Sequence, residues 1–143
     1  MTTTLGFSEA RNSLADLFDA ALTHVPTRIA RRRSGEAILI SREDLLRLVG
    51  RYEFKPDVYF EDGAVSIWLP ELEIWGRGPT FAAARDDLIE EIRQYVAEFR
   101  SDERLRTAPN HVGRTPWVVR ALLIDDDSEL ADAVFAGPVD RSG

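Results

Sequence analysis

In the first part of the chain, apolar residues recur with the spacing of an amphipathic helix. From Ala10 to Leu22 they follow one another at intervals of one, three or four positions, and Ser8 before them is a favourable N-cap. A second apolar-rich run lies between Ser41, another favourable cap, and Gly50, a residue type that commonly ends helices. The pattern therefore predicts two helices, one that starts after Ser8 and one between Ser41 and Gly50.

Short apolar runs suited to β-strands lie around these helices. Residues 3–5 form one run, and residues 27–30 and 36–40 form two more, separated by the turn pair Ser34-Gly35. Residues 1–50 are accordingly predicted to form a small α+β unit. Because a unit of that size buries little apolar surface alone, we expect it to dimerise.

Strand alternation dominates the next part of the chain, residues 52–100. The residues predicted to share the buried face of one strand are Val65, Ile67 and Leu69. The pair Asp62-Gly63 before them predicts a β-hairpin. A third strand is predicted over residues 72–75 and a turn over residues 76–79, and Thr80 is expected to cap a long helix. This segment is therefore predicted to be a βββα unit.

The last part of the chain, residues 101–143, reads as a linker followed by short helices. Residues 101–114 are polar and contain proline, asparagine and glycine, which predicts the linker. The pair Thr115-Pro116 predicts the start of one short helix. The acidic run Asp125–Asp127 precedes another, predicted over residues 129–135.

The composition, 44% hydrophobic and 30% charged over 143 residues, is typical of a soluble globular protein. No apolar run approaches the roughly 20 residues that a membrane span needs, and the N-terminus does not resemble a signal peptide. The chain has no cysteine, and His24 and His111 are its only histidines, so no disulfide or metal site is predicted. We expect a cytoplasmic protein without a cofactor and without a membrane partner.

Charge is distributed unevenly along the chain. Residues 1–51 contain eight arginines and six acidic residues, whereas residues 52–100 contain five basic and eleven acidic residues. Residues 101–143 contain five basic and eight acidic residues. The locally basic N-terminal end suits phosphate, because phosphate contacts act over a short, screened range. The acidic remainder suits a basic protein partner.

Two groups of residues in the basic part are candidates for DNA binding. Arg31, Arg32 and Arg33 lie at the predicted hairpin turn, and Arg11 and Asn12 lie near the start of the first predicted helix. Arginine can bind phosphate or guanine with two hydrogen bonds, asparagine can read adenine, and helix N-termini attract phosphate. The alternative interpretation of the arginine run is a solvated turn.

The order of these motifs is itself informative. Phe7-Ser8-Glu9-Ala10-Arg11-Asn12-Ser13-Leu14 is followed by Ile29-Ala30-Arg31 and by Gly35-Glu36-Ala37-Ile38-Leu39-Ile40-Ser41. Over about residues 2–50 this order resembles the Phd/YefM family of bacterial antitoxins. The resemblance implies that two chains pair through their small sheets and first helices. It also implies that the dimer binds a palindromic operator with basic residues at the positions of Arg11 and Arg31.

A second resemblance lies in the middle of the chain. It is carried by Gly63-Ala64-Val65-Ser66-Ile67-Trp68-Leu69-Pro70, then Gly76-Arg77-Gly78-Pro79-Thr80 and Ala83-Ala84. A strand that ends at proline, then a Gly-Thr turn into an alanine-rich helix, is similar to HicB-type antitoxins. The resemblance implies a truncated ribonuclease-H-like βββα fold. The alternative is a generic βββα packing module.

Six carboxylates in the same segment raise the alternative of a metal-dependent nuclease of reduced ribonuclease-H type. They are Glu53, Asp57, Glu61, Asp62, Glu71 and Glu73. Two-metal hydrolysis needs several carboxylates to converge on one site. These carboxylates lie at strand ends and turns, and alternate strand positions point to opposite faces. We therefore expect no catalytic residue and no enzymatic activity.

Two hydrophobic sets are candidates for partner binding. Trp68 and Trp75 are expected on the sheet face opposite the buried one, where they either pack within the protein or anchor a partner. Trp117, Val118 and Leu122 lie in the helical part after the predicted linker, where a short amphipathic helix could dock in a groove of a toxin. The alternative for this helix is packing against the body of the dimer.

Together these patterns indicate a type II antitoxin that binds a cognate toxin directly. It would repress its own operon by binding operator DNA as a dimer or a larger assembly. Residues 1–50 are expected to bind DNA and to dimerise, and residues 52–143 to bind the toxin or form a second interface. A solitary Phd-like transcription regulator without a toxin is the first alternative, and the nuclease is a remote second.

Overall fold

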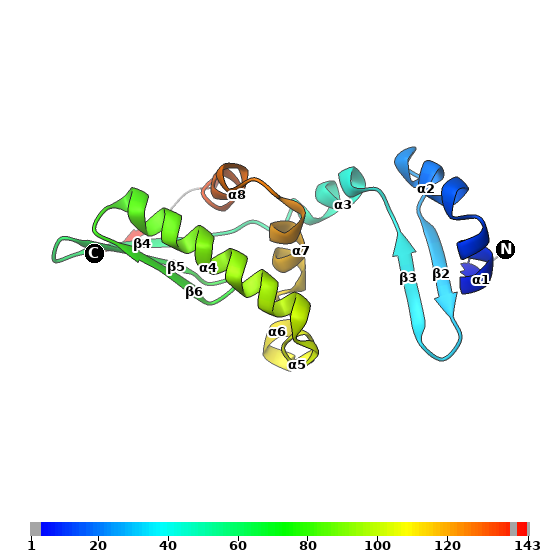
Figure 1. Cartoon of the computed structure of the whole chain (residues 1–143). Helices are drawn as coiled ribbons and strands as arrows, with labels where there is room; N and C mark the ends of the chain where they lie inside the picture. The colour runs from blue at the N-terminus through cyan, green and yellow to red at the C-terminus, as the bar shows by residue number, and fades with distance from the viewer. Residues whose placement is uncertain (1–3, 138–139, 143) are drawn as a thin grey trace. The chain divides into compact units, whose positions relative to one another are not determined.

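The chain forms two compact units, residues 1–48 and residues 49–143 (Figure 1). The structure, a computed structural model, describes residues 4–137 and 140–142. Both units combine helices with a small β-sheet, so the chain is an α+β protein, as its sequence predicts.

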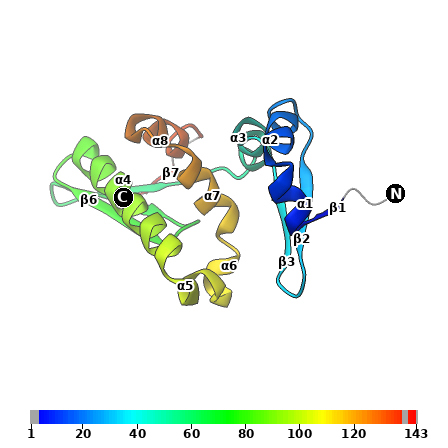
Figure 2. The same ribbon diagram turned by 45° about the vertical axis from the view of Figure 1, so that its right-hand side comes forward.

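The N-terminal unit is a three-stranded sheet with the strand order β1-β2-β3. Its elements are β1 (Thr4–Gly6), α1 (Phe7–Asn12), α2 (Leu14–Leu22), β2 (Thr27–Arg31), β3 (Gly35–Leu39) and α3 (Arg42–Val49). β1 is parallel to β2, because α1 and α2 carry the chain back between them, and β2 is antiparallel to β3. The helices α1 and α2 pack beside the β2–β3 hairpin (Figures 1 and 2).

The first predicted helix is divided into two. α1 begins at Phe7 with Gly6 as its N-cap and no side-chain cap, so the prediction that Ser8 caps this helix is wrong. The physical reason is that β1 ends at Gly6 and the chain enters the helix directly. Ser13, at φ −114°, then separates α1 from α2.

The local signals for α3 and for the hairpin before it are confirmed. The Asp44 N–H donates to the Ser41 Oγ at 3.1 Å, which is the predicted cap of α3. Arg31 pairs with Gly35 at the closed end of the β2–β3 hairpin.

The second unit is built on a four-stranded sheet with the strand order β6-β5-β4-β7. Its elements are β4 (Asp57–Glu61), β5 (Ala64–Leu69), β6 (Ile74–Gly78), α4 (Phe81–Ser101), α5 (Glu103–Thr107), α6 (Pro109–Val112), α7 (Thr115–Leu123), α8 (Asp127–Val134) and β7 (Asp140–Ser142). β4, β5 and β6 form an antiparallel meander, and β7 is parallel to β4. The long helix α4 packs on β5 and β6 (Figure 1).

The predicted hairpin between β4 and β5 is confirmed. Asp62 and Gly63 have φ values of 48° and 74°, the left-handed conformations that a tight two-residue hairpin loop requires. Thr80 also caps α4 as predicted, because its Oγ1 accepts the Ala83 N–H at 3.1 Å.

The turn predicted over residues 76–79 is wrong, since Gly76 and Gly78 lie within β6. A Cβ atom on Gly76 would lie 2.5 Å from the Ala84 carbonyl oxygen and 2.5 Å from the Leu88 Cβ. These glycines therefore serve close packing of α4 on the strand, and not a turn.

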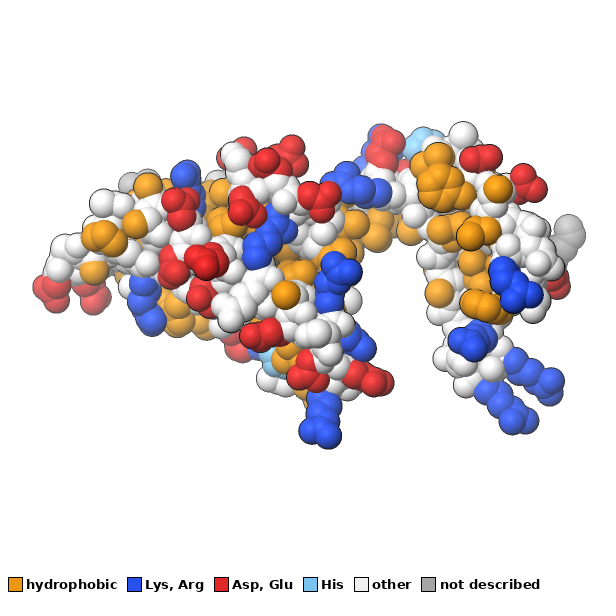
Figure 3. Space-filling model, in the orientation of Figure 1, with side chains coloured by type: hydrophobic (Ala, Val, Ile, Leu, Met, Phe, Trp, Pro, Cys, Tyr) orange, Lys and Arg blue, Asp and Glu red, His pale blue; other side chains and the backbone are white. Residues whose placement is uncertain are grey.

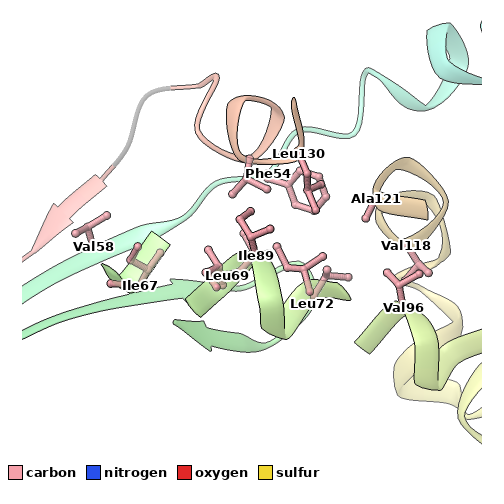
Figure 4. Packing of buried hydrophobic residues seen from close by; sticks show 14 of the residues in the cluster. Phe54, Val58, Ile67, Leu69, Leu72, Ile89, Val96, Val118, Ala121 and Leu130 are labelled. Atoms are coloured by element: carbon pink, nitrogen blue, oxygen red, sulfur yellow. The ribbon is translucent and has the colours of Figure 1, made fainter. Parts of the chain in front are cut away.

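One hydrophobic core joins the sheet to α4, α7 and α8 (Figure 4). Its most deeply buried large side chains are Phe54, Val58, Ile67, Leu69, Leu72, Leu88, Ile92, Val118, Leu130 and Val134. None of the described helices combines the length and the apolar character that a membrane span requires.

Residues 101–114, predicted to be a linker, form the short helices α5 and α6 instead. Contacts with the body of the unit hold this segment. The Tyr95 hydroxyl lies 2.8 Å from the His111 Nδ1, and the Arg114 guanidinium donates to the Leu72 carbonyl at 3.1 Å. Polar composition alone does not reveal such contacts, because they join residues far apart in the sequence.

Candidate DNA-binding and partner-binding surfaces

The arginine run occupies the turn of the β2–β3 hairpin. Arg31 is the last residue of β2 and pairs with Gly35, so Arg32 and Arg33 lie in the loop. Arg33 has a left-handed backbone, at φ 64°, and the Ser34 N–H donates to the Arg31 carbonyl at 3.0 Å. All three arginines are exposed, and basic side chains gather at this end of the hairpin (Figure 3).

Phe7 connects the hairpin to α1. The Arg31 guanidinium lies 5.1 Å from the centroid of the Phe7 ring, a cation–π contact. Arg11 follows Phe7 by one helical turn, so the two side chains share one side of α1. An open hollow of about 640 Å³ beside Phe7 is lined by Gly6, Phe7, Ser8, Glu9, Ala30, Arg31 and Arg32.

Arg11 and Asn12 are exposed, but they are the last two residues of α1 and do not start a helix. The expectation that a helix N-terminus assists them in binding phosphate is therefore wrong. The reason is the break at Ser13, which ends α1 after six residues. Only the hydrogen-bonding groups of the Arg11 and Asn12 side chains remain available for binding DNA at this site.

The arginines of this unit differ in whether they are neutralised. Arg28 forms an ion pair with Glu36, with Nε and Oε1 2.5 Å apart, and this hydrogen bond lowers the pKa of the Glu36 carboxyl. In contrast, no carboxylate among the described residues pairs with Arg11, Arg32 or Arg33. These guanidinium groups are thus free to bind an anion.

The described residues of the N-terminal unit leave half of their large apolar side chains exposed and bury none of them fully. Among its described residues, only Ala10, Ala21 and Ser41 are buried. The exposed apolar side chains are Phe7, Leu14, Phe18, Leu22, Val25, Ile38 and Leu48. Three of these, Leu14, Phe18 and Leu22, are spaced by four residues and form a continuous stripe along α2, which we call the α2 stripe.

In the second unit, aromatic residues gather on the side of the sheet opposite α4, which we call the aromatic face. Trp68 and Trp75 are directly paired across β5 and β6, with ring centroids 4.9 Å apart. Tyr59 on β4 lies 6.0 Å from the Trp75 ring, and the Arg77 guanidinium lies 5.1 Å from it. Trp75 is nevertheless 38% exposed.

The C-terminal candidates for partner binding are divided by the structure. Trp117 packs edge-to-face on Tyr52, with centroids 5.3 Å apart, and its Nε1–H donates to the Glu53 carbonyl at 2.9 Å. Val118 is 1% exposed, so it cannot contact a partner in this fold, because the core of the unit covers it. Leu122 is exposed.

The carboxylates considered for a nuclease site are dispersed. The described part of the chain contains no group of three or more histidine and acidic side chains that could hold a metal ion. Glu71 is partly buried, which raises the pKa of its carboxyl, and its Oε1 accepts the Lys55 N–H at 2.5 Å. Glu73 forms an ion pair with Arg114.

A protein-family model named PHD_like, described as "Antitoxin of toxin-antitoxin, RelE / RelB, TA system", matches residues 1–136. The chain belongs to this antitoxin family. No curated protein matches the antitoxin. Its fold is similar to the crystal structure of a candidate antitoxin part of a toxin/antitoxin system from Syntrophomonas wolfei subsp. wolfei. The TM-score is 0.84 and the identity 18%, and the match covers 99% of the antitoxin and 100% of the other chain.

Sequence reasoning singled out Trp68 and Trp75 of the antitoxin but missed Tyr59 and Arg77. The signal that could have found them is strand register. Tyr59 and Arg77 both oppose Ser66, two positions from Trp68 on the same face of β5. Without the register, their common location could not be assigned.

Proposed function

We propose that the antitoxin neutralises a cognate toxin by direct binding and represses its own operon by binding operator DNA as a dimer. The observation that carries the proposal is the N-terminal unit, which combines a large exposed apolar surface with unpaired arginines at a hairpin tip. Family membership supports a toxin as the partner.

The α2 stripe is the proposed centre of the dimer interface. The unit has 48 residues, and those that the structure describes bury only two alanines and a serine, so it lacks a core that pairing with a second copy would supply. In a two-fold dimer the same stripe contributes from both chains. Burying one phenylalanine stabilises by about 1.5–3 kcal/mol, so losing Phe18 from both chains should raise the dimer dissociation constant roughly 100-fold or more.

Sedimentation velocity tests this interface with Phe18→Ser. Val112→Ser is the matched control, because Val112 is exposed to a similar degree, 52% against 54%, but lies in α6 of the second unit. The natural chain and the control should sediment as dimers at micromolar concentration, and Phe18→Ser as a monomer. A natural chain that is strictly monomeric would overturn the proposed dimer.

The arginines around Phe7 are the proposed DNA contacts. Arg31 lies over the Phe7 ring, Arg11 follows Phe7 by one turn of α1, and Arg32 and Arg33 lie in the loop. Each arginine that contacts a phosphate releases counterions, so the logarithm of affinity falls with the logarithm of salt concentration. A dimer that loses one contact per chain should lose about two units of this slope.

The DNA test uses the promoter fragment upstream of the antitoxin's own gene. Arg11→Ala and Arg31→Ala should weaken binding and reduce the salt slope. Arg104→Ala removes an exposed arginine from α5 and should change neither. Equal affinity and slope in all three variants would leave the arginine run as a solvated turn.

Neutralisation is tested by co-expression with the protein encoded beside the antitoxin's gene. The two proteins should co-purify, and growth inhibition by the neighbouring protein should disappear. If operator binding is intact but neither result is obtained, the solitary-regulator alternative replaces the proposal.

A further inference from the structure

The aromatic face presents the residue types that dominate protein–protein binding energy. Trp75 lies at its centre, in contact with Trp68, Tyr59 and Arg77. Tryptophan, tyrosine and arginine are the residues most enriched among interface hot spots. The mutual packing of these side chains fixes their conformations before a partner arrives, which lowers the entropic cost of binding.

Two carboxylates flank the rings on the same face. Asp57 on β4 pairs directly with Trp68, and Glu61 lies two positions beyond Tyr59 on the same strand. Neither carboxylate forms an ion pair with any residue that the structure describes. A cation that approaches this face therefore meets both ring faces and uncompensated negative charge.

We propose that the aromatic face is the docking surface for the toxin and that it receives a cationic side chain, an arginine by preference. The guanidinium would stack on the exposed ring of Trp75, beside the half-buried Tyr59, and pair with Asp57 or Glu61. Arg77 already occupies such a position beside Trp75, at 5.1 Å from the ring centroid, so the ring environment accepts a guanidinium. This inference rests on the proposed function.

Charge decides between a basic protein and a nucleic acid as the occupant. Exposed aromatic residues on a sheet can also stack the bases of single strands, but such sites lie in positively charged grooves. Residues 52–100 instead contain eleven acidic and five basic residues, and β4, β5 and β6 contribute two acidic residues and one arginine to the aromatic face. Phosphate would be repelled here, whereas a basic protein surface would be attracted.

The test measures binding of the antitoxin to the protein encoded beside its gene by calorimetry. Trp75→Thr should raise the dissociation constant about 30-fold or more, the effect of losing one hot-spot residue. Phe81→Thr is the matched control, because Phe81 is 37% exposed and lies on α4, on the other side of the sheet. It should bind like the natural chain.

A second variant tests the negative charge of the aromatic face and should leave the fold intact. The double variant Asp57→Asn, Glu61→Gln should slow association and weaken its dependence on salt, whereas Glu90→Gln on α4 should do neither. Operator binding should be unchanged in every variant.

The outcomes separate this inference from the proposed function. If the natural chain binds the neighbouring protein and both the Trp75 and the charge variants bind equally well, the aromatic face is not the docking surface, although the proposed function stands. If the natural chain does not bind that protein, both the inference about the aromatic face and the toxin binding of the proposed function are wrong. If Trp75→Thr instead abolishes binding to a poly-dT oligonucleotide and leaves toxin binding intact, the face is a single-strand platform and the inference is wrong.

Discussion

Replacing Gly76 by alanine tests how closely α4 is packed on the sheet. The added Cβ would lie 2.5 Å from the Ala84 carbonyl oxygen, 2.5 Å from the Leu88 Cβ and 2.7 Å from the Leu88 backbone nitrogen. Two of these atoms belong to the backbone of α4, so no side-chain rotation can relieve the overlap. The helix as a whole has to move away from β6.

The magnitude follows from this geometry. Overpacking by one methyl group in a well-packed core typically costs about 1–3 kcal/mol. Because Gly76 meets backbone atoms, we expect a loss of about 3 kcal/mol in the free energy of unfolding of the second unit. With a urea m value of about 1.5 kcal/mol/M, the midpoint should fall by about 2 M.

Urea unfolding followed by tryptophan fluorescence is the appropriate assay. Trp68, Trp75 and Trp117 are the only tryptophans and all lie in the second unit, so the signal reports that unit alone. Gly113→Ala is the control, because nothing lies within 4 Å of the added Cβ and Gly113 has φ −66°, which alanine adopts readily. This variant should be as stable as the natural chain or slightly more stable.

An unchanged midpoint in Gly76→Ala would refute this reasoning. It would mean that α4 does not approach β6 as closely as the structure places it, and that the glycine serves the turn that the sequence pattern predicts.

Three further perturbations have defined outcomes. Thr80→Ala should lower the free energy of unfolding of the second unit by about 1 kcal/mol in urea titrations, because it removes the cap that accepts the Ala83 N–H. The hydrogen bond from His24 lowers the pKa of the Asp44 carboxyl below its ordinary 3.8, so this group stabilises the folded N-terminal unit above pH 3.8 and loses that effect as the pH falls further. Carbon-detected NMR titration should show the lowered pKa in the natural chain and a return toward the ordinary value in His24→Ala. Trp117→Ala should lower the free energy of unfolding of the second unit by about 3 kcal/mol, and with it the melting temperature, while toxin binding persists. Loss of toxin binding at an unchanged melting temperature would contradict the structural role of Trp117.

The features that the sequence predicted correctly depend on near neighbours. Ser41, Thr80 and the Asp62-Gly63 pair act on residues within three positions, so their effect is encoded locally. The glycines of β6 show where this fails. A missing side chain favours a turn as much as it permits close packing, and only the position of α4 decides between them.

The candidate surfaces also divide into features set by near neighbours in the sequence and features set by distant contacts. That Arg31, Arg32 and Arg33 are exposed at a turn is predictable from composition and turn chemistry. The burial of Val118 is not, because it depends on a core built from segments far apart in the chain. For the same reason, the gathering of Tyr59 with two tryptophans needed the strand register.

The parallel pairing of β4 with β7 sets the order in which the units can be completed during synthesis. The N-terminal sheet needs no residue beyond Leu39, whereas β4 waits for residues 140–142 before its outer edge is covered. Domains generally fold in turn from the N-terminus as the chain emerges. Nascent chains thus carry a complete N-terminal sheet while the free edge of β4 can still accept a foreign strand. A ribosome that stalls before residue 140 would leave a product in which this edge of β4 is uncovered, which favours aggregation.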